Sequence, residues 1–245
     1  MSTTRKLARN LFSLTLASAI MKLIGLAVVI YTARVLGAEA YGQWNFAITV
    51  AAYFGVFVNL GVGPVGAREL AQRPERLPEL LSQIIPLKFL SSLVGLVLAA
   101  VVAWVIPKPV EVKWLIFLCY LPLAMAFWHM DWVFTGVERL HWLAVGQVVE
   151  QLVAAVAIFI LVHESAHVAR LPLSALVGTT VGCGVMWWML WRHYRPLRFR
   201  PDLSESRRWL RASLPVAAAW ILGQLNFSFD TVMLSFLRTD AEVGW

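Results

Sequence analysis

The sequence contains seven apolar stretches, each long enough to cross a lipid bilayer as one helix. Crossing the hydrocarbon core of about 30 Å takes roughly 20 residues, because each residue of an α-helix advances the chain by about 1.5 Å. The pattern predicts an all-α polytopic membrane protein with about seven transmembrane helices. The stretches cover approximately residues 11–35, 41–66, 84–106, 114–134, 142–162, 171–191 and 213–237.

The composition excludes other classes of protein. Of the 245 residues, 60% are hydrophobic and 14% are charged, whereas soluble domains average about 45–50% apolar and about 25% charged residues. So few charged side chains cannot give this much apolar mass a water-facing shell, which excludes a soluble enzyme, a disordered chain and a secreted disulfide scaffold. Cys119 and Cys183 both lie inside apolar stretches, where we expect them to act as small buried hydrophobic residues.

The basic residues predict the orientation in the membrane. If the N-terminus lies in the cytoplasm, fourteen of the 21 Lys and Arg residues fall in inner segments and five in outer ones. Loops rich in Lys and Arg stay in the cytoplasm. The excess of basic residues therefore indicates a cytoplasmic N-terminus, and it requires no nucleic-acid partner.

Charged residues inside the predicted spans are the candidate functional groups, because such charges are costly in lipid and usually face a cavity or a partner. Lys22 lies roughly 16 Å into the first span, so its ammonium group needs either a substrate or a structural ion pair with Glu150. Lys88 lies only four residues inside the third span. It can either face a site or extend its side chain to the cytoplasmic surface.

Three carboxylates are candidates for ion coupling or for ion pairs. Glu150 lies about 12 Å deep in the fifth span, as a partner of Lys22 or as a proton-coupling carboxylate. Asp131 and Asp230 lie near the ends of their spans. A helix cap or an interfacial hydrogen bond is the expected role of these two.

His163, Glu164 and His167 match the H-E-x-x-H pattern of zinc peptidases, which places two His on one helix face beside a catalytic Glu. Here the pattern falls in a short outer loop, with no evident third ligand. We expect a polar loop and no metal site. The sequence also contains no P-loop, Gly-rich nucleotide fingerprint or Ser-His-Asp arrangement, so we expect no enzyme, no cofactor and no ATP hydrolysis.

Four short patterns occur in order at the ends of the predicted helices. They are R-x-L-G at 34–37 with Y-G at 41–42, N-L-G at 59–61 with R-E at 68–69, W-x-x-x-G-x-E at 132–138, and S-L-P at 213–215 with Asp230 fifteen residues later. Together they resemble the polysaccharide transporter family, the O-antigen and lipid-linked oligosaccharide flippases. This family belongs to the multidrug/oligosaccharidyl-lipid/polysaccharide exporter (MOP) superfamily.

The resemblance implies two six-helix lobes around a cavity that opens alternately to each side of the bacterial inner membrane. It implies a cationic lumen for an undecaprenyl-pyrophosphate-linked glycan, in which we place Lys22, Arg34 and Lys88. The implied partners are this glycan, membrane lipids and the polysaccharide polymerase and chain-length machinery. Residues 1–212 would form the N-terminal lobe, with an Arg-rich cytoplasmic loop at 192–212. Residues 213–245 would begin a second lobe, so we expect a fragment of a longer transporter.

Rival functions remain open. An ion-coupled multidrug exporter of the same superfamily would need a cavity dominated by carboxylate and aromatic groups. A membrane enzyme would be the zinc peptidase described above or a glycan polymerase. A seven-helix receptor would need its N-terminus outside, against the distribution of basic residues.

Overall fold

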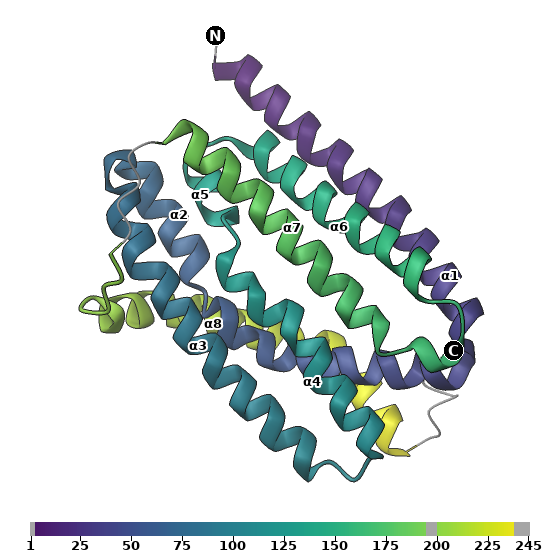
Figure 1. The fold of residues 1–245 in the computed structure, drawn as a ribbon. Coiled ribbons are helices and arrows are strands. Elements are labelled where there is room, and N and C mark those ends of the chain that lie inside the picture. Colours follow the sequence, from purple (N-terminus) through teal and green to yellow (C-terminus); the bar gives the residue numbers. More distant parts are fainter. Residues whose placement is uncertain (1–2, 195–199, 238–245) are drawn as a thin grey trace.

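The computed structural model describes residues 3–194 and 200–237, which form helices joined by short connections (Figure 1). The all-α prediction is confirmed over these residues. Three short 3₁₀ helices, Pro74–Arg76, Ala126–Trp128 and Ser165–His167, lie between the longer elements. The α-helices of the described ranges are α1 Thr3–Asn59, α2 Val62–Gln72, α3 Leu77–Val105, α4 Val110–Met125, α5 Asp131–Gly136, α6 Leu140–Leu161, α7 Arg170–His193 and α8 Ser206–Leu237.

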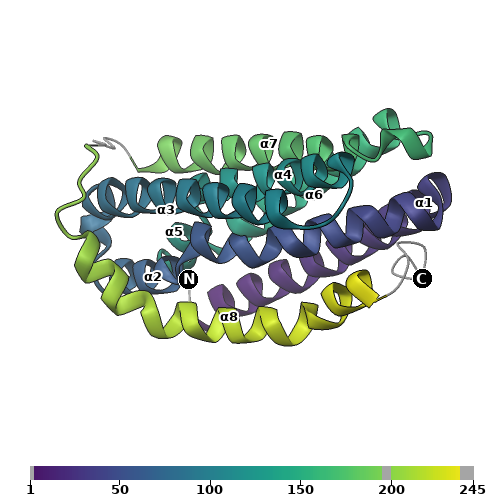
Figure 2. The same cartoon turned by 90° about the horizontal axis from the view of Figure 1, so that it is seen from below.

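The first two predicted spans form the two arms of α1, which bends at Gly37. This residue has φ +73° and ψ 170°, a conformation that glycine adopts because it has no Cβ. The first arm runs along the bundle to one of its ends, and the second arm returns from that end (Figure 2). The glycine of the first sequence pattern therefore separates two membrane-length helices.

Two predicted spans are interrupted. The span predicted at 41–66 ends at Asn59, because Leu60 and Gly61 have φ of 42° and 67°, and α2 then begins at Val62. The span predicted at 114–134 is divided into α4, a 3₁₀ turn and α5. Pro122 lies inside α4, and the interruption follows Met125. The prediction of continuous helices was wrong for both segments.

Four helical stretches of the described residues have the length and composition to cross a membrane. The first has 61 residues, which is enough for two crossings at about 1.5 Å per residue. Of the other predicted spans, α4 has 16 residues, and the apolar run of α8 is interrupted by polar residues such as Gln224 and Asn226. The four stretches are Phe12–Gln72, Pro74–Val105, Leu140–Leu161 and Arg170–His193.

The helices pack around the second arm of α1. A core cluster joins this arm to α3 and α4 through residues such as Phe46, Ile84 and Ile116. The first arm packs on α6, where the Tyr31 hydroxyl donates a hydrogen bond to the Val162 carbonyl at 2.7 Å. α7 and α8 lie on opposite sides of the bundle (Figure 2). α8 begins at Ser206, so its first turns replace the end of the loop predicted at 192–212.

Candidate functional site

A cavity of about 340 Å³ lies where the two interrupted segments meet. The end of α1 and the start of α2 form one wall, and the residues around α5 form another. Side chains of α3 and α8 complete the lining. Discontinuous helices commonly form the binding sites of membrane transporters, because the interruptions present polar groups inside the bundle. The lining residues are Asn59, Gly63, Pro64, Ala67, Lys88, His129, Asp131, Trp132, Thr135 and Trp220.

Lys88 is the buried cation of this cavity. It is only 3% exposed, and because α3 begins at Leu77, it lies roughly 16 Å along that helix. The expectation that Lys88 could reach the surface assumed a helix starting at residue 84, and it was wrong. Asp131 interacts electrostatically with Lys88, so the buried charge has a carboxylate nearby.

His129 connects two carboxylates beside Lys88. Its Nε2 lies 3.3 Å from Glu150 Oε2, and its Nδ1 lies 4.0 Å from Asp131 Oδ2. The sequence reasoning missed this residue, because it considered only Lys, Arg, Asp and Glu as charges inside the spans. The available signal was the position of His129 two residues before Asp131, at the end of an apolar stretch.

α7 packs against α6 and positions the Glu150 side chain. The Thr179 hydroxyl donates a hydrogen bond to Glu150 Oε1 at 2.9 Å. A Cβ atom at Gly182 would lie 2.6 Å from the Glu150 Cβ, so only glycine lets α7 approach α6 this closely. A row of interacting polar groups, which we call the interior row, therefore links α3, the start of α5, α6 and α7. It consists of Lys88, Asp131, His129, Glu150 and Thr179.

The structure does not bring the other predicted site residues to the cavity. Lys22 and Arg34 lie on the first arm of α1 with exposed side chains. Among the described side chains neither forms an ion pair, so the predicted pair of Lys22 with Glu150 is absent. Asp131 is the first residue of α5, and its side chain lines the cavity. Asp230 belongs to α8, but its side chain lies outside the described part of the structure.

The H-E-x-x-H residues lie in the connection between α6 and α7, as predicted. Only Ser165–His167 of this connection is helical, in a single 3₁₀ turn. His167 Nδ1 accepts a hydrogen bond from the His163 backbone N–H at 3.2 Å, and His167 Nε2 lies 2.9 Å from Glu164 Oε1. The Glu therefore contacts one of the two His residues in a surface turn, instead of standing beside them on an α-helix.

Comparison with known proteins gives the family. Residues 7–245 match the family described as "Polysaccharide biosynthesis protein". The chain belongs to this family. The resemblance of the four sequence patterns is thus confirmed. A comparison with curated proteins gives no match.

Two solved transporters have a similar fold. One is a multidrug resistance MATE family transporter of the MOP superfamily in its outward-facing conformation, with a TM-score of 0.61 and 20% identity. The other is a MOP superfamily transporter from Pyrococcus furiosus Vc1 (DSM3638), described by the reverse polarity of its binding pocket, with a TM-score of 0.60 and 19% identity.

Both alignments cover 91% of this chain and 53% of the solved chain. The chain therefore spans about half the length of the transporters it matches. The chain therefore belongs to the polysaccharide biosynthesis protein family, and its fold is similar to that of about half of each transporter.

Proposed function

We propose that this chain forms the substrate-binding half of a flippase for a lipid-linked oligosaccharide. The substrate would be undecaprenyl-pyrophosphate-linked, and its glycan would serve surface polysaccharides such as the O-antigen of lipopolysaccharide. The family supports a glycan-related substrate. The observation that carries the proposal is the buried Lys88 at the junction of two interrupted helices.

Lys88 would bind the pyrophosphate. An ammonium group buried in a low-dielectric cavity attracts an anion more strongly than the same group in water. Asp131 would neutralise Lys88 when the cavity is empty, so that arriving pyrophosphate replaces one negative partner with another. The cavity would hold only the headgroup, while the polyprenyl tail stays in lipid.

The interior row also supports ion coupling. His129 lies between two carboxylates, and an imidazole can carry a proton between such groups. Pyrophosphate at Lys88 would free Asp131 to pair with His129 and so change the number of protons on the row. We therefore assign ion coupling to Asp131, His129 and Glu150, and transport would not require ATP hydrolysis.

Alternating access moves one lobe against another, so this chain would work with a second lobe. The positive-inside distribution supports a cytoplasmic N-terminus in the bacterial inner membrane. The polysaccharide polymerase and chain-length machinery would act on the translocated product.

Complementation of a flippase-deficient bacterium tests the proposal, with surface polysaccharide as the readout. We expect wild type to restore the polysaccharide and Lys88→Gln to reduce it at least about tenfold, equivalent to about 1.4 kcal/mol. Lys22→Gln is the matched control, because it removes an exposed charge from another predicted span. Equal activity of Lys88→Gln and wild type would contradict the proposed role of Lys88. If wild type fails despite good membrane expression, the assay is repeated with the second lobe co-expressed.

Multidrug export is the second candidate function. The same cavity presents Asp131 with the aromatic rings of Trp132 and Trp220, a combination that suits organic cations. In a dye-efflux assay, this alternative predicts loss with Asp131→Asn and little change with Lys88→Gln. The flippase hypothesis predicts no dye efflux by the wild-type protein or by either variant.

A further inference from the structure

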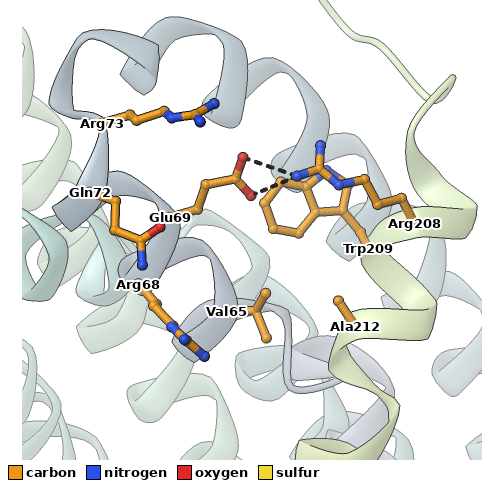
Figure 3. Close-up of a pocket in the computed structure, with 8 residues that line it drawn as sticks. All are labelled: Val65, Arg68, Glu69, Gln72, Arg73, Arg208, Trp209 and Ala212. Carbon is orange, nitrogen blue, oxygen red and sulfur yellow. Dashed lines mark hydrogen bonds and ion pairs between the residues drawn. The ribbon is translucent and has the colours of Figure 1, made fainter.

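A second pocket, of about 310 Å³, lies between α2 and the first turns of α8. It shares no lining residue with the cavity around Lys88. Figure 3 shows Glu69 and Arg208 facing each other across it, with the Trp209 ring beside Arg208. The lining residues are Val65, Arg68, Glu69, Gln72, Arg73, Arg208, Trp209 and Ala212.

The lining carries three guanidinium groups and one carboxylate. Glu69 is already shared, because its Oε1 accepts hydrogen bonds from Arg76 Nη1 and, at 3.3 Å, from Arg208 Nη2. Arg68 and Arg73 form no ion pair or hydrogen bond with any described side chain. Their donors therefore remain available beside a pocket with excess positive charge.

The α8 wall of this pocket is held in place by a buried hydrogen bond. Trp209 is only 2% exposed, and its Nε1 donates to Gln83 Oε1 of α3 at 3.0 Å. The Arg208 guanidinium lies 5.8 Å from the centre of the Trp209 ring, within range of a cation–π interaction. The pocket is thus formed before any ligand arrives.

We propose that this pocket binds the phosphate group of a lipid headgroup, through Arg68, Arg73 and Arg208. Planar guanidinium groups bind phosphate oxygens with paired hydrogen bonds, and the net positive charge of the lining attracts both a singly charged phosphodiester and a more highly charged pyrophosphate. The positive-inside distribution predicts that the pocket faces the cytoplasmic leaflet, where anionic lipids are found. The phosphate could belong to an anionic glycerophospholipid or to a polyprenyl-pyrophosphate lipid. The proposal does not depend on the flippase function.

Native mass spectrometry of the full chain in detergent tests the proposal with two probes, phosphatidylglycerol and farnesyl pyrophosphate. Both are titrated in the Lys88→Gln background, so that the interior row does not contribute to the signal. We expect Arg68→Gln/Arg73→Gln to weaken the better-bound probe at least about tenfold, and Arg68→Lys/Arg73→Lys to bind with intermediate affinity because it keeps the charge but loses the planar groups. The probe with the larger loss identifies the source of the phosphate.

Arg207→Gln/Arg211→Gln is the matched control. It removes two exposed arginines from the same turns of α8, and neither residue lines the pocket. We expect it to bind both probes as the Lys88→Gln protein does. Equal affinity of the Lys88→Gln protein with and without Arg68→Gln/Arg73→Gln for both probes would overturn the proposal. An equal loss in the control would also overturn it, because binding would then reflect the general charge around the pocket.

Discussion

The protein contains two charged clusters of similar composition. They lie in different surroundings, and we expect them to have different roles for that reason. In the interior row, Lys88, Asp131, His129 and Glu150 lie inside the bundle on elements that are distant in sequence. In the second cluster, which we call the terminal cluster, Glu69 joins Arg76 and Arg208 at the end of the bundle. Lys88 in the first cluster is only 3% exposed, whereas the Arg208 side chain in the second is 55% exposed, so water can replace a lost partner of Arg208 but not one of Lys88.

The comparison shows how burial determines the free energy that an ion pair contributes to stability. Breaking a buried ion pair by removing one partner costs about 3–5 kcal/mol, while exposed ion pairs contribute about 0–1 kcal/mol. The interior groups therefore need exact positioning by neighbouring helices. Arg68 and Arg73, which line the pocket beside the terminal cluster, form no ion pair with a described side chain and can bind an external anion.

The strongest test of the comparison disturbs the scaffold behind the interior row. A Cβ at Gly178 would lie 2.6 Å from the Glu150 carbonyl oxygen, and one at Gly182 would meet the Glu150 side chain. We expect Gly178→Ala/Gly182→Ala to lower the free energy of unfolding by about 1–3 kcal/mol per site, measured by thermal unfolding in detergent. Gly184→Ala is the control, because a Cβ there meets nothing within 4 Å. It should be neutral or stabilising by up to about 1 kcal/mol. Unchanged stability of the double variant would contradict the close packing.

A direct test neutralises one carboxylate in each cluster. Glu150→Gln removes the ion pair with His129 but can still accept the Thr179 hydrogen bond, and we expect it to cost about 2 kcal/mol. Glu69→Gln should cost less than about 1 kcal/mol, because Arg76 keeps its ion pair with Glu79 and the Arg208 side chain is 55% exposed to water. Added salt at 1 M should reduce only the Glu69→Gln effect, because buried pairs are screened less. Similar costs and similar salt dependence in both variants would show that the two clusters do not differ.

The hydrogen bond that holds α8 against α3 gives a smaller effect. Trp209→Phe removes the donor and leaves the buried Gln83 acceptor unsatisfied, at a cost of about 1 kcal/mol. Trp209→Phe/Gln83→Leu should recover part of that loss, since both partners are then apolar. Trp104→Phe, at a position that is 82% exposed, is the control. Denaturant titration measures all three variants, and an additive double variant would argue against the coupling.

The smallest effect concerns the connection that precedes α8. Asp202 Oδ1 accepts a hydrogen bond from the Ser204 backbone N–H at 2.9 Å, and this bond lowers the pKa of Asp202 below its ordinary value of 3.8. Because the folded-state pKa is the lower one, the stabilisation is present above pH 3.8 and disappears as the pH falls through the folded-state value. Thermal midpoints of wild type and Asp202→Asn should converge over this acidic range. A difference that is constant with pH would contradict the role of the carboxylate.

Several features of the fold could be predicted from the sequence. The length of each apolar stretch is a local property of the sequence, so it predicted the helical class and most helix positions. The short patterns at the helix ends indicated the family. The break at Gly37 falls between two predicted spans. The positions of Lys88, Asp131 and Glu150 inside apolar stretches also marked them as candidates, because such charges need partners.

The site itself depends on contacts that a hydropathy pattern does not contain. The helices are interrupted at Leu60–Gly61 and after Met125, where the apolar stretches predicted continuous spans. Lys88 is buried because α3 begins earlier than the predicted span. The pattern singled out Lys22 equally, yet its side chain is exposed. The length of an apolar stretch determines that the segment is helical. Which charged residues lie together depends on the packing of side chains from different helices. The sequence alone therefore determined a helical membrane protein of this family, and only the tertiary structure decided that Lys88, His129 and Glu150 share one interior.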